Sequence, residues 1–166
     1  MTDNFIEQLV TRKTTIDVVF KKIGLILVTV ISALAMIVLP QLFQILMWVT
    51  VGLCVFDYFM FRRMNIEYEY SYFNGDLDID KIMNKESRKK LFFVNVKEME
   101  VIAPTGSDAL RPFTQLKKLD FSSAMPGAKT YEMVTEFKGN KVRVVFEPNE
   151  EMLHAMRDLA PRKVFF

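Results

Sequence analysis

One long apolar stretch dominates the N-terminal third of the chain. From Ile23 to Phe56 no position carries a charged residue. A single helix of that length would measure about 51 Å, far more than the roughly 30 Å of a bilayer's hydrocarbon core. Pro40 and Gln41 interrupt the stretch, because proline removes an amide donor and clashes with the preceding helical turn. The pattern predicts a transmembrane helical hairpin at residues 23–63, with spans at 23–39 and 42–61.

Charges at the two ends of this hairpin predict its orientation. Lys and Arg precede the first span and follow the second, whereas the loop between them has no charge: Arg12, Lys13, Lys21, Lys22, Arg62 and Arg63. The positive-inside rule therefore predicts a multi-pass protein of the cell membrane, with both termini and the soluble domain in the cytoplasm. A cleaved signal peptide competes with this interpretation, because Ala33-Leu34-Ala35 has a small-x-small pattern. The apolar run continues beyond it, which favours a retained anchor.

The first 22 residues form a separate amphipathic segment in this interpretation. Ile6, Leu9 and Val10 have helical spacing, with acidic residues before them and basic residues after them. We expect a short amphipathic helix on the cytoplasmic face of the membrane, or a frayed tail. Asp57 is the one acidic residue within a span, and it lies close enough to Arg62 to be an interfacial carboxylate or, alternatively, an intramembrane functional group.

After Arg63 the apolar pattern changes from helical periodicity to a period of two. Tyr68, Tyr70 and Tyr72 alternate with polar residues, and Asn74-Gly75 has the composition of a tight hairpin turn. Six further strands are predicted, at 76–80, 89–94, 96–103, 115–122, 130–137 and 142–146. A final helix follows Pro148-Asn149 and carries the apolar stripe Met152, Leu153, Met156 and Leu159. The soluble part, residues 64–166, is therefore predicted to be mainly β with one C-terminal helix.

This element order resembles that of pleckstrin-homology-like (PH-like) domains. The string from Asn74 to Ile82, and the tail from Glu150 to Phe165, are similar to an uncharacterised family of small bacterial membrane proteins. The resemblance implies a two-helix N-terminal anchor followed by a barrel of about seven antiparallel strands capped by the C-terminal helix. It implies no activity.

Composition narrows the functional classes. The chain has 51% hydrophobic and 25% charged residues, with 22 Lys+Arg and 20 Asp+Glu, which argues against disorder and against binding of nucleic acid. Cys54 is the single cysteine, so neither disulfides nor a cysteine metal site are expected. His154 is the single histidine, and Ser107-Asp108 has the composition of a loop turn, so no catalytic residues and no cofactor are predicted.

Three aspartates at alternate positions raise the question of a metal site. Asp76, Asp78 and Asp80 share one face of a predicted strand. Calcium sites instead wrap a flexible loop around the ion and add a distal glutamate. We therefore expect a solvated strand face and no bound metal.

Basic residues gather in connections that strand counting places next to the membrane. If each strand reverses direction after Arg63, the segments 81–90, 104–114 and 138–141 lie at the membrane end. The candidate lipid-binding residues are Lys81, Lys85, Arg88, Lys89, Lys90, Arg111, Lys138 and Lys141. Such a cluster gains about 1 kcal/mol per Lys or Arg near anionic lipid. Docking on anionic headgroups is one hypothesis, and simple solvation of the loops is its alternative.

A second hypothesis is binding of another protein. PH-like domains expose a sheet edge beside the terminal helix, where a peptide can add as a strand. The apolar tail Val164-Phe165-Phe166 either occupies a partner's groove or packs on its own domain. A third hypothesis is a small oligomeric pore or transporter component, in which Asp57 faces inward. The sequence favours a noncatalytic, membrane-tethered interaction or scaffolding module, whose partner is the lipid bilayer together with a membrane protein or further copies of the chain.

Overall fold

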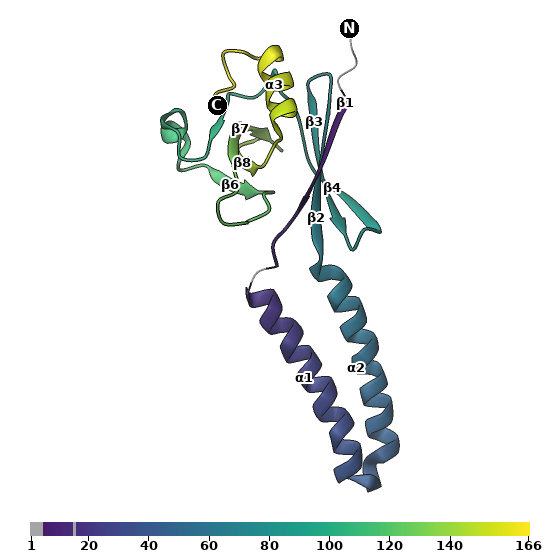
Figure 1. Cartoon of the computed structure of the whole chain (residues 1–166). Coiled ribbons are helices and arrows are strands. Elements are labelled where there is room, and N and C mark those ends of the chain that lie inside the picture. The colour runs from purple at the N-terminus through teal and green to yellow at the C-terminus, as the bar shows by residue number, and fades with distance from the viewer. Residues whose placement is uncertain (1–4, 15) are drawn as a thin grey trace. The chain divides into compact units, whose positions relative to one another are not determined.

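The computed structural model describes residues 5–14 and 16–166 (Figure 1). The chain forms two compact units. One unit is the helical segment Thr14–Asn65, and the other combines the residues up to Lys13 with Ile66–Phe166. The helical segment is therefore inserted into the sequence of the β domain.

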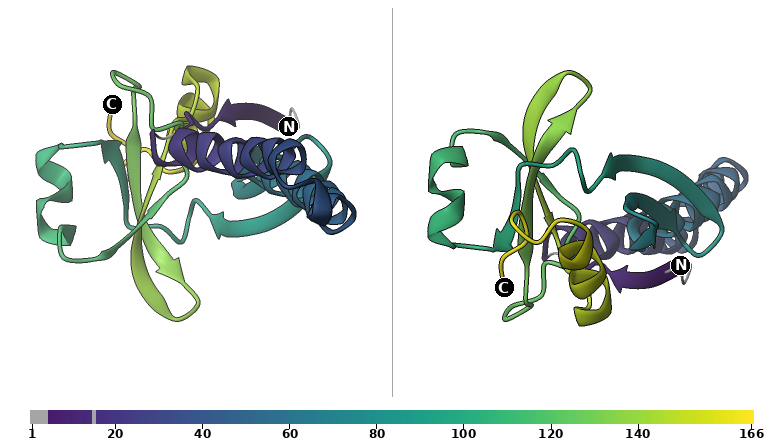
Figure 2. Two further views of the ribbon diagram at one scale, coloured as in Figure 1. Left: turned by 90° about the horizontal axis from the view of Figure 1, so that it is seen from below. Right: turned by 90° about the horizontal axis from the view of Figure 1, so that it is seen from above.

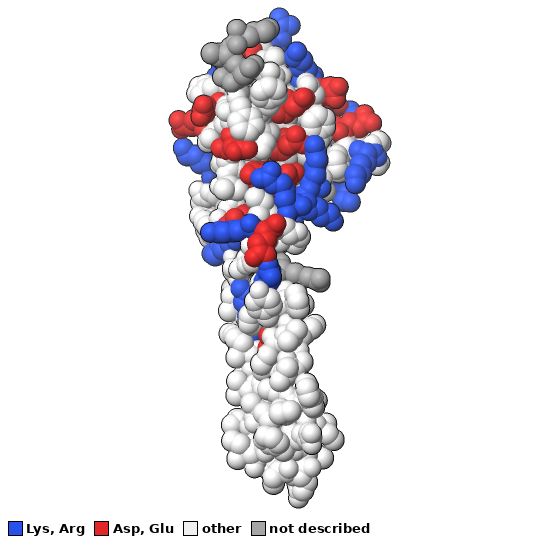
Figure 3. Space-filling model, turned by 90° about the vertical axis from the view of Figure 1, so that its right-hand side faces the viewer, with Lys and Arg blue, Asp and Glu red and all other residues white. Residues whose placement is uncertain are grey.

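The inserted unit is a helical hairpin. Helix α1 spans Ile16–Val38, the short 3-10 helix η1 spans Pro40–Leu42, and α2 spans Phe43–Met64. Pro40 occupies the first turn of η1, which confirms the predicted break. Both long helices are long and apolar enough to cross a membrane, with mean hydropathy of 2.1 and 1.7. Figure 3 shows almost no charged side chains over this part of the molecule.

The first sheet of the β domain is antiparallel, in the order β1-β2-β3-β4 (Figure 1). Its strands are β1 (Phe5–Thr11), β2 (Ile66–Phe73), β3 (Asp76–Met83) and β4 (Ser87–Asn95). The predicted hairpin turn between β2 and β3 is confirmed: Asn74 and Gly75 both have positive φ, 49° and 101°. The tyrosines at alternate positions of β2 are buried, as the period of two predicts.

Strand β1 corrects the prediction for the N-terminal segment. Residues 5–11 are not an amphipathic helix but an edge strand that pairs with β2 over its whole length. Ile6 and Val10 are 5% and 7% exposed, whereas Leu9 is 61% exposed, so the burial follows a period of two. The segment is short, and the spacing 6, 9, 10 fits a helix; pairing with a distant strand decided its conformation. The domain therefore does not begin at residue 64.

The second sheet has the order β5-β7-β8-β6. Its strands are β5 (Val101–Pro104), β6 (Lys117–Asp120), β7 (Tyr131–Phe137) and β8 (Asn140–Phe146). Strand β6 pairs with β8 in parallel, because a long connection containing η2 (Asp108–Phe113) carries the chain across the sheet between β5 and β6 (Figure 2). The prediction of seven antiparallel strands closed into a barrel is therefore wrong: within residues 5–14 and 16–166, eight strands form two separate sheets.

Helix α3 (Glu150–Leu159) follows β8 and confirms the predicted C-terminal helix. The Asn149 side chain accepts a hydrogen bond from the Met152 amide, which caps its first turn. Met152, Leu153 and Met156 are buried in a core that both sheets line, together with Tyr70, Phe92 and Phe146. This architecture of two sheets and a C-terminal helix agrees with a PH-like fold.

Candidate functional site

Strand β1 leaves one side of its backbone without a partner strand. The Arg12 amide donates to the Ile66 carbonyl over 3.0 Å, so the even-numbered residues of β1 direct their backbone groups toward β2. The odd-numbered residues Glu7, Leu9 and Thr11 therefore direct theirs toward the open edge. Within the described part of the chain, the edge is bonded only at its end, where the Lys13 amide donates to the Ser123 carbonyl.

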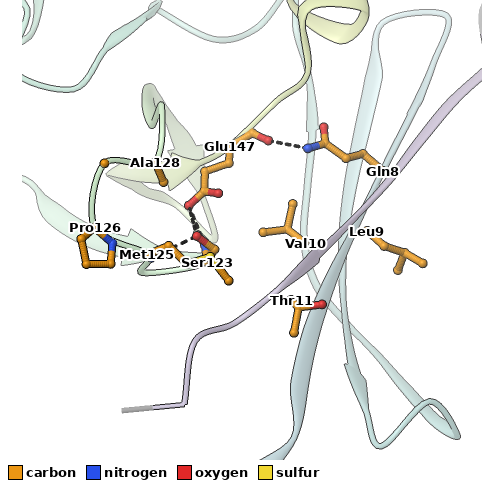
Figure 4. A pocket seen from close by; sticks show the side chains of 10 residues that line it. Gln8, Leu9, Val10, Thr11, Ser123, Met125, Pro126, Ala128 and Glu147 are labelled. Atoms are coloured by element: carbon orange, nitrogen blue, oxygen red, sulfur yellow. Dashed lines mark hydrogen bonds between the residues drawn. The ribbon is translucent and has the colours of Figure 1, made fainter. Parts of the chain in front are cut away.

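A groove of about 580 Å³ runs along this edge (Figure 4). One wall is β1, from Gln8 to Thr11, and the other is the loop from Ser123 to Ala128, with Glu147 at the base. Its apolar lining comes from both walls: Leu9, Val10, Met125, Pro126 and Ala128. Met125 and Leu9 are 51% and 61% exposed, so apolar surface faces the solvent on both sides of the groove.

Hydrogen bonds fix the two walls relative to each other. The Ser123 amide and hydroxyl both donate to Oε1 of Glu147, each over 2.7 Å. Gln8 reaches across from β1, where its Nε2 donates to the Glu147 carbonyl and its Oε1 accepts from the Asn149 amide. The polar groups at the base are thus matched within the domain, which leaves the β1 backbone as the open hydrogen-bonding surface of the groove.

The other sheet edges have protection that β1 lacks. The tail covers β5, since the Ile102 amide donates to the Lys163 carbonyl and the Phe165 amide donates to the Ile102 carbonyl. Strand β4 has three consecutive basic residues and a register shift at its partner, and β6 is four residues long with two exposed lysines. Short strands, lysines and bulges are the common ways to prevent edge pairing. On β1, Phe5 and Leu9 are exposed, whereas the exposed Phe93 of β4 lies against the Lys90 ammonium.

The basic residues predicted to bind lipid differ in their local contacts. Four of them form ion pairs within the domain: Arg88 with Glu69 and Asp80, Lys90 with Asp78, Arg111 with Asp108, and Lys141 with Glu100. Lys138 stacks on the Phe137 ring. Lys81, Lys85 and Lys89 have no ion pair among the described residues, and Lys81 lies directly opposite Lys89 in the sheet. Lys85 lies in the turn that joins β3 and β4, so these three lysines belong to one hairpin, and they are called the basic cluster below.

The three basic connections do not share one end of the domain. Pro104 pairs with Tyr131 at the start of β7, whereas the turn at residues 138–139 follows Phe137 at its other end. Segment 104–114 then crosses the second sheet, where Leu110 packs on Val101, Ala103 and Val134. The expectation that all three lie together is therefore wrong, because strand counting assumed that each strand reverses direction.

The tail residues predicted to contact a partner pack on the domain itself. Val164 bridges to Ile102 and is 2% exposed. Phe166 contacts the His154 ring edge-on at 5.2 Å and lies against the Arg157 guanidinium, while Phe165 and Phe166 remain 48% exposed. His154 is thus a surface residue that supports the tail.

The three aspartates of β3 and the buried Asp57 have local partners. Asp78 and Asp80 pair with basic residues of β4, and the Asn95 side chain donates to Asp76. No group of three or more His, Cys, Asp or Glu residues that could hold a metal ion occurs in the described ranges. In the helical hairpin, the Thr29 hydroxyl donates to Oδ2 of Asp57 over 2.6 Å, and Asp57 is 8% exposed. It is therefore buried between the two helices rather than at a hydrated surface.

Burial and ion pairing shift the pKa of three groups in the domain. Burial raises the pKa of Tyr70, whose hydroxyl donates to the Phe121 carbonyl over 2.7 Å. Burial likewise raises the pKa of Tyr72. The hydrogen bond to Asp78 raises the pKa of the Lys90 ammonium. None of these groups lines the groove, so they bear on stability rather than on a site.

The fold and the open edge define a class of protein: a two-sheet PH-like domain with a helical hairpin inserted between its first two strands. The chain belongs to the bacterial PH-like domain family DUF6106, whose family model matches residues 2–166. This confirms the predicted resemblance to a bacterial PH-like family. No curated protein matches the chain, and no solved structure does.

The edge of β1 is the feature that the sequence analysis missed. Ile6 and Val10 face the core, but Gln8 between them is polar and the outward Leu9 is apolar, so the residues do not alternate strictly. The spacing 6, 9, 10 therefore fits a helix better than a strand, and local pattern alone predicts the wrong element here. The groove was beyond prediction, since its second wall comes from residues more than 100 positions away.

Proposed function

We propose that this chain is a noncatalytic, membrane-tethered module that binds another protein through the open edge of β1. The observation that carries the proposal is the contrast between edges: β5 is covered, β4 and β6 are short or charged, and β1 exposes Phe5 and Leu9 beside a groove. An open edge of this kind binds extended segments by backbone hydrogen bonds.

The tether in this proposal is the helical hairpin. Two apolar helices of sufficient length support it, and the basic residues on both flanks favour a cytoplasmic domain. Because β1 precedes α1 and β2 follows α2, the two ends of the hairpin must lie on the same side of any bilayer for the strands to pair. Cleavage after residue 35 would remove β1 from the domain, so this fold supports a retained anchor.

Site-specific photo-crosslinking tests the interaction in native membranes. A photoreactive amino acid at Leu9 is compared with one at Glu136, an exposed position of β7 away from the groove. We expect a discrete protein adduct from position 9 and none from position 136. Equal labelling from both positions, or no protein adduct from position 9, would contradict the proposal.

Anionic-lipid contact is a second candidate function. The observation that favours it is the cluster of Lys81, Lys85 and Lys89, in which two lysines face each other across the strands. Like charges placed directly opposite are destabilising unless an anion compensates them. Ion pairs within the domain reduce the case for Arg88, Lys90, Arg111 and Lys141.

Amine labelling of the full chain in nanodiscs tests the lipid contact. Lys117 and Lys118, which are exposed on β6, are the internal controls. We expect labelling of Lys81, Lys85 and Lys89 to slow several-fold when phosphatidylglycerol replaces part of the phosphatidylcholine, with the controls unchanged. Equal rates in the two lipid mixtures would rule out this function.

A further inference from the structure

From the groove's lining and charge we infer the chemistry of its occupant: an extended segment of another protein, with apolar residues at alternate positions and Lys or Arg between them. This inference rests on the proposed function, because it specifies what binds at the β1 edge.

Backbone pairing sets the conformation of the occupant. The outward backbone groups of Glu7, Leu9 and Thr11 repeat at every second residue, which matches the hydrogen-bonding period of a neighbouring strand. The loop wall from Ser123 to Ala128 lies beside them, across the groove (Figure 4). A helix cannot present backbone donors to this edge, so the occupant is extended.

The lining of the groove determines which side chains the occupant carries on its inner face. Successive side chains of an added strand alternate between the two faces of the enlarged sheet. Those on the inner face meet Val10, Met125 and Ala128, which are apolar and line the groove. Glu147 and Ser123 are already bonded to each other and have little to offer a polar side chain. Every second residue of the occupant is therefore apolar.

Charges on the first sheet determine which side chains the occupant carries on its outer face. The outer face of the first sheet, where Figure 3 shows acidic and basic groups interleaved, carries Glu7 on β1, and it carries Glu69 and Glu67 on β2, opposite Leu9 and Thr11. Arg88 pairs with Glu69, but Glu7 and Glu67 have no ion pair among the described residues. A strand added to β1 places its outer side chains next to Glu7 and Leu9. Lys or Arg at these positions compensates the remaining negative charge.

A binding experiment on the full-length protein in nonionic detergent tests this chemistry. The probe is a fluorescein-labelled heptapeptide of alternating lysine and valine, followed by anisotropy. A glutamate-valine heptapeptide tests charge, and a lysine-valine heptapeptide N-methylated at alternate residues tests backbone pairing at constant charge. We expect the lysine-valine peptide to bind at least tenfold more tightly than either comparison peptide. Equal binding of the N-methylated peptide would overturn the inference.

Variants locate the binding to the edge. Leu9→Lys places a positive charge on β1, and we expect at least a tenfold loss of affinity. Phe93→Lys is its matched control, because Phe93 is an exposed apolar residue of the same sheet on β4, and we expect unchanged affinity. Glu7→Lys should reverse the preference toward the glutamate-valine peptide. Both edge residues are exposed, and unchanged melting temperatures will show that the variants are folded.

The two experiments separate the inference from the proposed function. If the peptide series shows no preference while position 9 crosslinks to a protein in membranes, the deduced chemistry is wrong and the interaction module stands. If position 9 also gives no adduct, both are wrong.

Discussion

The main-chain amide of Arg12 donates a hydrogen bond to the carbonyl of Ile66 over 3.0 Å, although the whole helical hairpin lies between these residues in the sequence. This bond continues the ladder between β1 and β2 to the point where the chain leaves the sheet at both ends. The helical hairpin thus occupies the place of an ordinary β-hairpin turn. A segment starting at residue 64 lacks one strand of its own sheet.

The domain should therefore fold without the helices only when β1 is retained. We expect a chain in which an Asn-Gly turn of about four residues replaces residues 14–65 to unfold cooperatively in urea, because Arg12 and Ile66 are already paired. Residues 64–166 alone lose the burial of Ile6 and Val10, a cost of about 3–6 kcal/mol. Equal urea midpoints for the two chains would contradict this assignment of β1.

The two faces of β1 should respond differently to truncation. Ile6→Ala removes a side chain that is 5% exposed and should lower the free energy of unfolding by about 2–4 kcal/mol. Leu9→Ala removes one that is 61% exposed and should change it by no more than about 0.5 kcal/mol. Urea unfolding of the domain with the short turn measures both. If the two variants lost similar amounts of unfolding free energy, or if Leu9→Ala lost more, the register assigned to β1 would be wrong.

Alkaline pH should destabilise the domain through Tyr70. Burial raises its pKa above the ordinary value of 10.0, so the folded state holds this proton more tightly than the unfolded state. The stabilisation is complete below pH 10 and is lost as the pH rises above 10 toward the folded-state pKa. The Tyr72 pKa shift acts in the same direction.

The Tyr70→Phe variant isolates this contribution. It loses the hydrogen bond to the Phe121 carbonyl, at a cost of about 1 kcal/mol at pH 8. Its unfolding free energy should then fall less steeply than that of the parent between pH 10 and 11.5. Parallel curves for the two proteins would show that Tyr70 does not titrate differently on unfolding.

The ion pair between Arg143 and Glu132 should be sensitive to the loss of one partner. Arg143 Nε lies 3.0 Å from Glu132 Oε2, and the two side chains are 18% and 5% exposed. Arg143→Met leaves a buried carboxylate without its cation and should cost about 3–5 kcal/mol. The double variant Glu132→Gln/Arg143→Met should recover most of this cost in urea unfolding. Similar stability of the single and double variants would contradict a role for the buried charge.

The elements with strong local patterns were predictable from the sequence. The apolar helices, their break at Pro40, the Asn74-Gly75 turn and the capped helix after Asn149 all depend on neighbouring residues. Features that depend on distant pairing were not. The strand β1 is specified by contacts with β2 across the hairpin, and the parallel pairing of β6 depends on a connection that crosses a sheet. The sequence also could not show which candidate lipid-binding residues are already paired. Arg88 and Lys90 find their acidic partners on neighbouring strands of the folded sheet.

The insertion of the hairpin between β1 and β2 sets an order of events during synthesis. The first strand leaves the ribosome before either apolar helix, and it has no partner until the second helix is complete and β2 follows. If the helices span a membrane as proposed, a molecule in which only one of them inserts has β1 and β2 in opposite compartments, and these strands cannot pair. Under the proposed anchoring, completion of the β1–β2 ladder, and with it the formation of the groove, is therefore a checkpoint: the proposed binding edge forms only on molecules whose two helices have been inserted with both ends on one side.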